Sequence, residues 1–561
     1  MANPVETVDR THRTAALTLV VTATSLLILG IYHGLLQVLY RAGWIRSMSF
    51  LGLDYYQGLT LHGVVNAIVY TTFFEVAFGY VVVNYFLRTP LNATVTWLAV
   101  GTMLIGTVMA AIPILTGHAS VLYTFYPPLK ASPWFYLGAA LLVVGSWIPF
   151  FQWIAAYLSW RRSHPREKTP LAVVGMLATF TVWLIATLPL AVEVLVLLLP
   201  WSLGWTETVN VVLARTLFWF FGHPLVYFWL LPAYVMYYVM LPTIVGGKLF
   251  SDATARLAFL LFIVFSAPVG LHHQYADPGV SVGYKWLHGV LTFCVAIPSF
   301  LTAFTVAASL EHGARRAGGT GLFGWWAKLP YLDTNRYLFA YAFCGLVLFL
   351  FGGITGIVNA SVTMNNVVHN TAWIPGHFHT TLGGPVFLAF LGLSLWMVTE
   401  LLGREIRFPK GNVWVPYLWL AGVALFSTGL SVAGILGEPR RTNMAVTYSN
   451  PESPLFQPSW EFWTWLGALG GILMTVAMIV YFVVFFSTLF SPATVRRPFE
   501  IPTAEPLHDE EAPWVQNFTP WLVVAVILLV IAYVPPLYEV LAGPSTPAPA
   551  YEPHSPVPVA R

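Results

Sequence analysis

The sequence predicts an all-α polytopic membrane protein, a bundle that crosses the bilayer about thirteen times. Hydrophobic residues make up 57% of the 561 positions and charged residues only 9%, whereas soluble domains carry roughly 25% charged residues. The apolar stretches are long and continuous, as membrane helices of about 20 residues require, and lack the short alternating pattern of a β-barrel. This composition excludes a soluble globular enzyme, a disordered chain and a nucleic-acid-binding protein.

The predicted spans follow one another almost without pause. We place them at 14–38, 57–87, 94–117, 134–160, 170–200, 210–241, 254–274, 284–310, 337–360, 371–402, 413–437, 459–493 and 516–541. One transmembrane domain, 14–541, therefore lies between an N-terminal segment, 1–13, and a Pro-rich C-terminal tail, 542–561. Two cysteines are too few for a disulfide scaffold or an iron–sulfur site.

The distribution of Lys and Arg predicts the orientation of the bundle. Cytoplasmic loops of membrane proteins carry an excess of these residues. With a cytoplasmic N-terminus, roughly 18 of the 26 Lys and Arg fall on the inner side and roughly 7 on the outer side. Segment 1–13 is thus predicted to be cytoplasmic, and an odd number of spans places the tail 542–561 outside. We expect a multi-pass protein of a prokaryotic plasma membrane.

Six of the 15 histidines lie at a similar depth, in the outer half of the predicted bilayer. Ionisable side chains within a membrane are costly and often mark functional sites. A single intramembrane histidine can equally be a hydrogen-bonded contact between helices, so the shared depth is what favours a role for the group. Neutral imidazole is a suitable ligand for copper and haem iron. The six are His62, His223, His272, His273, His377 and His379.

The spacing of two of these histidines predicts more than one centre. His377 and His379 are two residues apart, which is about 200° around a helix. They therefore cannot bind the same metal, and one helix is expected to stand between two cofactors. No thiolate lies near them in the sequence, so a zinc or iron–sulfur site is not favoured.

The other spacings predict a compact ligand set. His223 and Tyr227 are four residues apart and share a helix face, so Tyr227 can touch whatever His223 binds. His272 and His273 are adjacent, and both can reach one metal if the helix ends there. A nearby Pro268 permits such an ending.

Around these histidines the sequence resembles subunit I of the haem–copper oxidase superfamily, the cytochrome c oxidases. The matching motifs are Gly58-Leu59-Thr60-Leu61-His62-Gly63, Trp219-Phe220-Phe221-Gly222-His223-Pro224-Leu225-Val226-Tyr227, His272-His273 and Trp373-Ile374-Pro375-Gly376-His377-Phe378-His379. The resemblance covers nearly all spans in order. It implies reduction of dioxygen to water with electrons from a cytochrome c-like donor, coupled to proton translocation across the lipid bilayer.

The resemblance also implies two haems and one copper ion. The implied ligands are His62 and His379 for a low-spin haem of b type, His377 for a high-spin haem of a type, and His223, His272 and His273 for copper. It further implies that Tyr227 is catalytic and covalently bonded to the copper ligand that precedes it by four residues. Arg440 and Arg441 would pair with haem propionates, with ordinary loop charge as the alternative.

Where the sequence departs from the commonest branch of the superfamily, it resembles the B-type branch. Leu225 stands where the common branch has Glu, and no Lys lies between Leu213 and Met240. Asn370 replaces a metal-binding Asp, which puts an outer magnesium site in doubt. Glu193 and Arg215 are other charges within the predicted spans.

A single hydroxyl-lined route is then expected to carry cytoplasmic protons. Its candidates form two stripes at helical spacing, of which one runs inward from Tyr227. The alternative is that Ser and Thr simply hold membrane helices together. The candidates are Tyr234, Tyr238, Ser299, Thr302 and Thr305.

Electron entry requires a partner, because the chain has no Cys pair at the spacing of copper ligands. We expect a subunit II with a dicopper site, docked on the outer face near Arg440 and Arg441. Two alternatives remain open from the sequence. One is a nitric oxide reductase of the same superfamily, which would use non-haem iron and lack the tyrosine. The other is a redox-inactive transporter, which the absence of internal repeats disfavours.

Overall fold

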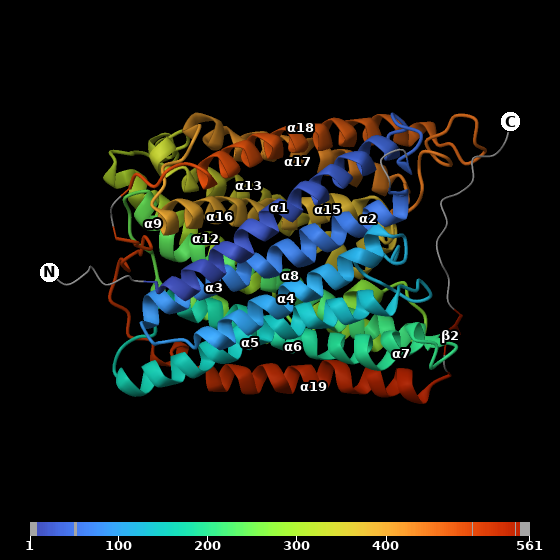
Figure 1. Cartoon of the computed structure of the whole chain (residues 1–561), viewed down its shortest axis with the longest axis horizontal. Coiled ribbons are helices and arrows are strands. Elements are labelled where there is room, and N and C mark those ends of the chain that lie inside the picture. The colour runs from blue at the N-terminus through green and yellow to red at the C-terminus, as the bar shows by residue number, and fades with distance from the viewer. Residues whose placement is uncertain (1–7, 50–52, 496–497, 545, 550–561) are drawn as a thin grey trace.

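The computed structural model describes residues 8–49, 53–495, 498–544 and 546–549, so parts of the predicted segments 1–13 and 542–561 lie outside the described residues. The helices run along one common axis, with α18 at one edge and α19 at the opposite edge (Figure 1). In chain order the helices are α1 (Arg10–Arg41), α2 (Tyr55–Gly63), η2 (Val64–Val69), α3 (Tyr70–Leu87), α4 (Ala93–Leu115), α5 (Pro133–Ser163), α6 (Leu171–Val192), η3 (Glu193–Leu198), α7 (Leu199–Ser202), α8 (Val211–Val235), η4 (Met236–Met240), α9 (Leu241–Ile244), α10 (Asp252–Phe265), η5 (Gly270–Gln274), α11 (Val282–Cys294), α12 (Ala296–Arg316), η6 (Gly324–Lys328), η7 (Thr334–Arg336), α13 (Leu338–Ala360), α14 (Val362–Val368), α15 (Trp373–Thr381), η8 (Leu382–Val386), α16 (Phe387–Leu402), α17 (Pro409–Ile435), α18 (Pro458–Leu489), η9 (Pro513–Val515) and α19 (Phe518–Ala542).

Within the described residues, twelve helical runs are long and apolar enough to cross a membrane. Five of them join several segments end to end: Tyr55–Leu87, Leu171–Ser202, Val211–Ile244, Val282–Arg316 and Trp373–Leu402. The runs Val211–Ile244 and Trp373–Leu402 are each 89% buried over their most apolar window, against 22% for Phe518–Ala542. The α8 and α15–α16 runs therefore form the centre of the bundle, and α19 lies at its periphery.

The predicted continuous span 254–274 is wrong. The structure has a 14-residue helix, α10, that ends at Phe265, and a 3-10 turn, η5, follows at Gly270–Gln274. Pro268 lacks the backbone N–H that would continue the helix. Gly270 packs against α8 so closely that a Cβ there would lie 2.1 Å from the carbonyl oxygen of Trp219. This short helix is the difference between the twelve long runs and the predicted thirteen spans.

The chain ends differ in detail from the prediction. Helix α1 begins at Arg10, inside the predicted segment 1–13, because the Asp9 side chain caps it by accepting from the His12 backbone N–H at 3.1 Å. At the other end, β2 (Pro547–Ala548) pairs antiparallel with β1 (Val209–Asn210), so this part of the tail is tied to the bundle. Helix α1 starts at one end of the bundle and α19 finishes at the other (Figure 1).

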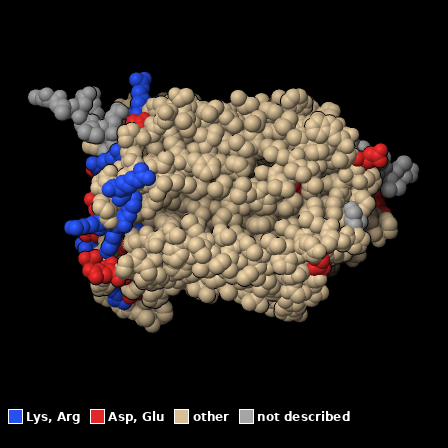
Figure 2. Space-filling model, turned by 90° about the horizontal axis from the view of Figure 1, so that it is seen from below, with Lys and Arg blue, Asp and Glu red and all other residues tan. Residues whose placement is uncertain are grey.

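On the face that Figure 2 shows, surface charge lies toward the two ends of the molecule. Lys and Arg side chains gather at the end where α1 begins, and a broad belt without charge separates the ends on the face that Figure 2 shows. This belt is the surface that an apolar bilayer core requires, because charged side chains at membrane depth are costly.

Four segments of π-helix interrupt the α-helices among the described residues: η2, η3, η4 and η8. Such segments are rare and occur often at functional sites. Segment η2 starts two residues after His62, and η8 starts three residues after His379. The backbone is therefore locally irregular beside both of these histidines.

Candidate metal and haem centres

Three imidazoles converge at the boundary between α8 and η5. One ligand atom from each of His223, His272 and His273 lies within 4.8 Å of the other two. Nδ1 of His223 is 3.1 Å from Nε2 of His273. Three ring nitrogens this close together, with no carboxylate or thiolate in the group, are a donor set that suits copper, as it does zinc, iron and nickel.

The early end of α10 brings the two adjacent histidines to one side. The ring of His273 stacks on Trp219 of α8, with centroids 3.8 Å apart and planes at 6°. His288 of α11 holds the turn from the other side, because its Nδ1 accepts from the Leu271 backbone N–H at 3.2 Å. The helix thus ends before these histidines, which is the condition under which both can reach one metal.

The outer nitrogens of the triad are also engaged. Nδ1 of His272 is 2.8 Å from the Thr292 hydroxyl, which leaves its Nε2 for a metal. Nε2 of His223 is 3.0 Å from the Tyr227 hydroxyl, which leaves its Nδ1. Partners of this kind fix the orientation of metal-binding imidazoles, so the residues present fit a copper ion.

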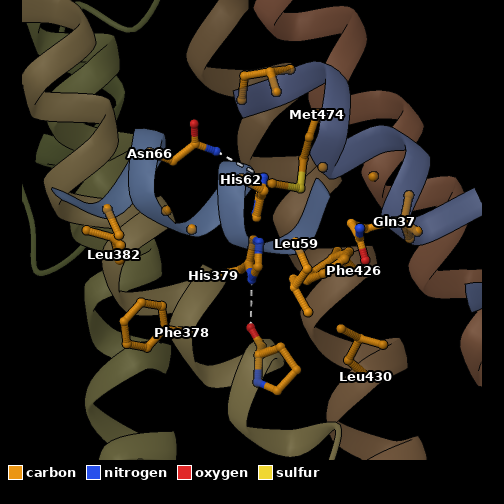
Figure 3. Close-up of a pocket in the computed structure, with 18 of the residues that line it drawn as sticks. Gln37, Leu59, His62, Asn66, Phe378, His379, Leu382, Phe426, Leu430 and Met474 are labelled. Carbon is orange, nitrogen blue, oxygen red and sulfur yellow. Dashed lines mark hydrogen bonds between the residues drawn. The ribbon is translucent and has the colours of Figure 1, made fainter. Parts of the chain in front are cut away.

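A second pair of histidines faces each other across a pocket. The rings of His62 on α2 and His379 on α15 are nearly parallel, at 11°, with centroids 6.1 Å apart (Figure 3). Metal–imidazole bonds are about 2 Å long, so two rings that bind one metal from opposite sides have centroids about 6 Å apart. Nδ1 of His62 is 2.8 Å from the carbonyl oxygen of Gly30, and Nδ1 of His379 is 2.7 Å from that of Pro375. Both Nε2 atoms are left for the metal, which fits a six-coordinate haem.

The pocket around this pair combines an apolar wall with a basic rim. Phe378, Phe426 and Met474 line it, as do Arg440 and Arg441. Burial and the neighbouring Arg441 lower the pKa of Arg440 to about 9. Nε of Arg440 is buried and has no hydrogen-bond partner among the residues that the structure describes. An anionic group at this rim would satisfy it, which fits a haem propionate.

His377 faces away from this pocket. Its Nδ1 is 2.8 Å from the hydroxyl of Thr355 on α13, so its Nε2 is available as a ligand. His379 lines the pocket together with His62, whereas His377 is not among the lining residues. The two histidines of α15 thus point in different directions.

Tyrosines continue from the triad toward the C-terminal end of α8 and into η4. Tyr227 and Tyr234 both pack on Phe262 of α10, with centroid distances of 5.3 and 5.5 Å. The rings of Tyr234 and Tyr238 are 5.9 Å apart, and the Tyr238 hydroxyl donates to the Thr302 hydroxyl at 2.6 Å. The two predicted stripes therefore meet at this hydrogen bond.

The other two residues of the predicted route, Ser299 and Thr305, lie on α12. The Ser299 hydroxyl donates to the backbone carbonyl of Val295 at 3.1 Å. The Thr305 hydroxyl is buried and, within the described part of the chain, has no hydrogen-bond partner.

Three charged side chains, Arg215, Glu193 and Glu75, lie in the helical runs and are not used by the expected centres. Arg215 makes a bidentate pair with Asp277, at 2.8 and 3.0 Å, and so is held near the N-terminal end of α8. Glu193 is fully buried, and so is Glu75 of α3. None of their carboxylate oxygens has a hydrogen-bond partner in the residues described. The sequence signal for Glu75 is a lone carboxylate inside an apolar span.

The helical bundle holds three converging imidazoles and, separately, two parallel imidazole rings. This arrangement is typical of membrane proteins that bind redox metals at two or more centres. The family of cytochrome c and quinol oxidase polypeptide I matches residues 14–473. The chain belongs to this family, and the predicted fold and superfamily are confirmed.

Individual relatives agree with the family assignment. The chain is 42% identical over 511 residues to cytochrome c oxidase subunit 1 of Thermus thermophilus, covering 89% of this chain and 88% of that protein. It is 27% identical over 268 residues to a probable quinol oxidase subunit 1 of Staphylococcus haemolyticus, covering 47% and 35%. A cryo-EM structure of a heme-copper terminal oxidase dimer matches with a TM-score of 0.95 and 51% identity, over 98% of this chain and 96% of that one.

Proposed function

We propose that this chain is the catalytic subunit of a terminal respiratory oxidase that reduces dioxygen to water with electrons from cytochrome c. The observation that carries the proposal is the joint presence of the His223, His272 and His273 triad and the parallel His62 and His379 pair in a chain of this family.

The proposed cofactors are two haems and one copper ion. His62 and His379 would hold a low-spin haem, of b type, whose propionates pair with Arg440 and Arg441. His377 would hold a high-spin haem, of a type, and the triad would hold copper. When bound, these groups supply the electron-transfer and dioxygen chemistry that side chains cannot.

The protein's own part is to orient the ligands, exclude water and move protons. Thr355 and Thr292 fix the rings of His377 and His272 through their Nδ1 atoms. The Tyr227 hydroxyl, 3.0 Å from a copper ligand, is placed to give up a proton beside the triad. A covalent bond from Tyr227 to His223 would lower the mass of the joined peptides by two hydrogens, which mass spectrometry measures.

Protons are proposed to arrive from the cytoplasm through hydroxyl groups. The support is the Tyr238 to Thr302 hydrogen bond at 2.6 Å and the position of Tyr234 between Tyr238 and Tyr227. Ser299 and Thr305 complete the proposed route on α12. Leu225 and the lack of a Lys from Leu213 to Met240 favour the B-type branch, in which this would be the one route.

The proposed orientation puts the N-terminus in the cytoplasm of a prokaryote and the C-terminus outside. It is supported by the gathering of Lys and Arg at the end where α1 begins (Figure 2). A subunit II with a dicopper site is proposed to dock on the opposite face near Arg440 and Arg441. A cytochrome c-like protein would deliver electrons to that subunit.

Oxygen consumption by the purified complex tests the proposal. Reduced cytochrome c should support cyanide-sensitive oxygen uptake, and His272→Ala should abolish it while both haem spectra persist. His118→Ala is the matched control, because His118 is exposed and belongs neither to the pocket lining nor to the histidine triad. Reduction of nitric oxide without oxygen uptake would contradict the proposal in favour of a nitric oxide reductase, and haem-free protein would favour a transporter. Uptake with quinol alone would contradict only the proposed donor.

A further inference from the structure

Asn66 contacts the same atom of His62 that the α1 backbone contacts. Its side-chain Nδ2 is 3.1 Å from Nδ1 of His62, and the carbonyl oxygen of Gly30 is 2.8 Å from that nitrogen. Figure 3 shows the Asn66 amide directed at His62 from one turn further along the chain. Neither sequence motif nor spacing singles this residue out.

The protonation state of a metal-binding His62 decides which way this amide must face. If Nε2 binds a metal, Nδ1 carries the proton and is a donor. It then donates to the Gly30 carbonyl, and the NH₂ group of Asn66 cannot also donate to it. The amide oxygen of Asn66, by contrast, could accept from the same N–H.

Rotating the Asn66 amide by half a turn would place its oxygen, instead of its NH₂ group, at Nδ1 of His62. Oδ1 of Asn66 is buried and has no hydrogen-bond partner among the described residues. A half-turn exchanges the two amide ends at nearly the same positions. It removes the conflict between two donors and gives the oxygen a partner.

The surrounding backbone is built for this contact. Asn66 lies in the π-segment η2, which begins two residues after His62. On α1, a Cβ at Gly30 would lie 1.7 Å from Oδ1 of Asn66, and one at Gly34 would lie 2.8 Å from Cε1 of His62. Only glycine at these two positions lets α1 approach both side chains.

We infer that Asn66 is a positioning residue for the low-spin haem, whose amide oxygen accepts from Nδ1–H of His62 and sets the basicity and orientation of that ligand. The inference rests on the proposed function, in which His62 binds this haem. An additional acceptor makes the imidazole more electron-rich and stabilises ferric over ferrous iron. Asn66 therefore holds the potential of this haem below the value that the Gly30 carbonyl alone would give.

The test is a redox titration of the low-spin haem in the purified holoenzyme. Asn66→Leu and Asn66→Ala should each shift the ferric–ferrous equilibrium toward ferrous by up to tenfold, which is about 59 mV for a one-electron couple. Gly30→Ala should shift it in the same direction, because the new methyl group displaces the amide. Gly101→Ala is the matched control on α4, where, in the described structure, no atom beyond its own stretch of helix lies within 4 Å of an added Cβ.

Electron paramagnetic resonance of the ferric low-spin haem gives a second readout, because its g-values report ligand basicity and ring orientation. Unchanged potentials and g-values in both Asn66 variants, with the haem retained, would overturn the inference. Loss of the haem from both variants would also overturn it, in favour of a purely structural role. Absence of a low-spin haem from the wild-type holoenzyme would instead contradict the proposed function.

Discussion

Replacement of Tyr227 by Phe removes one hydroxyl group beside the copper triad and leaves the ring in place. The lost contact is the 3.0 Å hydrogen bond to Nε2 of His223. A hydrogen bond between neutral groups contributes about 0.5–1.5 kcal/mol net, so copper affinity should fall by about tenfold at most. A positioned proton donor contributes about 10²–10⁴-fold to a rate. We therefore expect turnover to fall at least a hundredfold while copper and both haems remain bound.

The assay is oxygen uptake with excess reduced donor, on the same samples whose copper and haem contents are measured. Tyr237→Phe is the matched control. Tyr237 is fully buried on η4, and its hydroxyl donates to the Pro385 carbonyl at 3.3 Å instead of facing the triad. Full activity in Tyr227→Phe would refute the assigned role. A loss of activity that matches a loss of copper would refute it as well, because the hydroxyl would then act only in holding the metal site.

Three further outcomes are expected. Thr302→Val and Tyr238→Phe should each slow oxygen uptake with both haems intact. The double variant should be no slower than either, because the two hydroxyls share one 2.6 Å hydrogen bond. Additive losses in stopped-flow proton uptake would contradict a shared route. Glu438→Gln should lower the thermal unfolding midpoint and loosen the low-spin haem, because it breaks a buried 3.1 Å ion pair with Arg41. Loss of one partner of a buried ion pair costs roughly 3–5 kcal/mol. An unchanged midpoint by scanning calorimetry would contradict this. Extraction of copper with a chelator should abolish oxygen uptake and leave the low-spin haem spectrum unchanged, because the two sites share no ligand; a spectrum lost together with copper would contradict separate centres.

The helical bundle was predictable because its signal is simple. Long apolar runs locate the spans, since a membrane helix must satisfy its backbone internally and expose apolar side chains to lipid. The failure at 254–274 has a local cause. Hydropathy does not register that Pro268 ends a helix, although the pair His272 and His273 can reach one metal only if it does.

The sequence predicts the histidines of the candidate sites better than it predicts the hydrogen-bond partners that orient their rings. Helical spacing separates His377 from His379, and the structure orients them toward different neighbours. The partners that orient the rings come from distant parts of the chain, such as Thr355 for His377 and the Gly30 carbonyl for His62. No periodicity predicts them, because tertiary packing creates these contacts. Asn66 belongs to this group, since its contact depends on the close approach of α1.

The metal and haem content of the purified chain with its partner subunit tests the central claim most directly. Pyridine haemochrome spectra give the number and type of haems, and elemental analysis gives iron and copper on the same sample. The account predicts two haems, one of b type and one of a type, and one copper bound by this chain in addition to the copper of the partner. A third iron in place of that copper, or a preparation without haem, would contradict it.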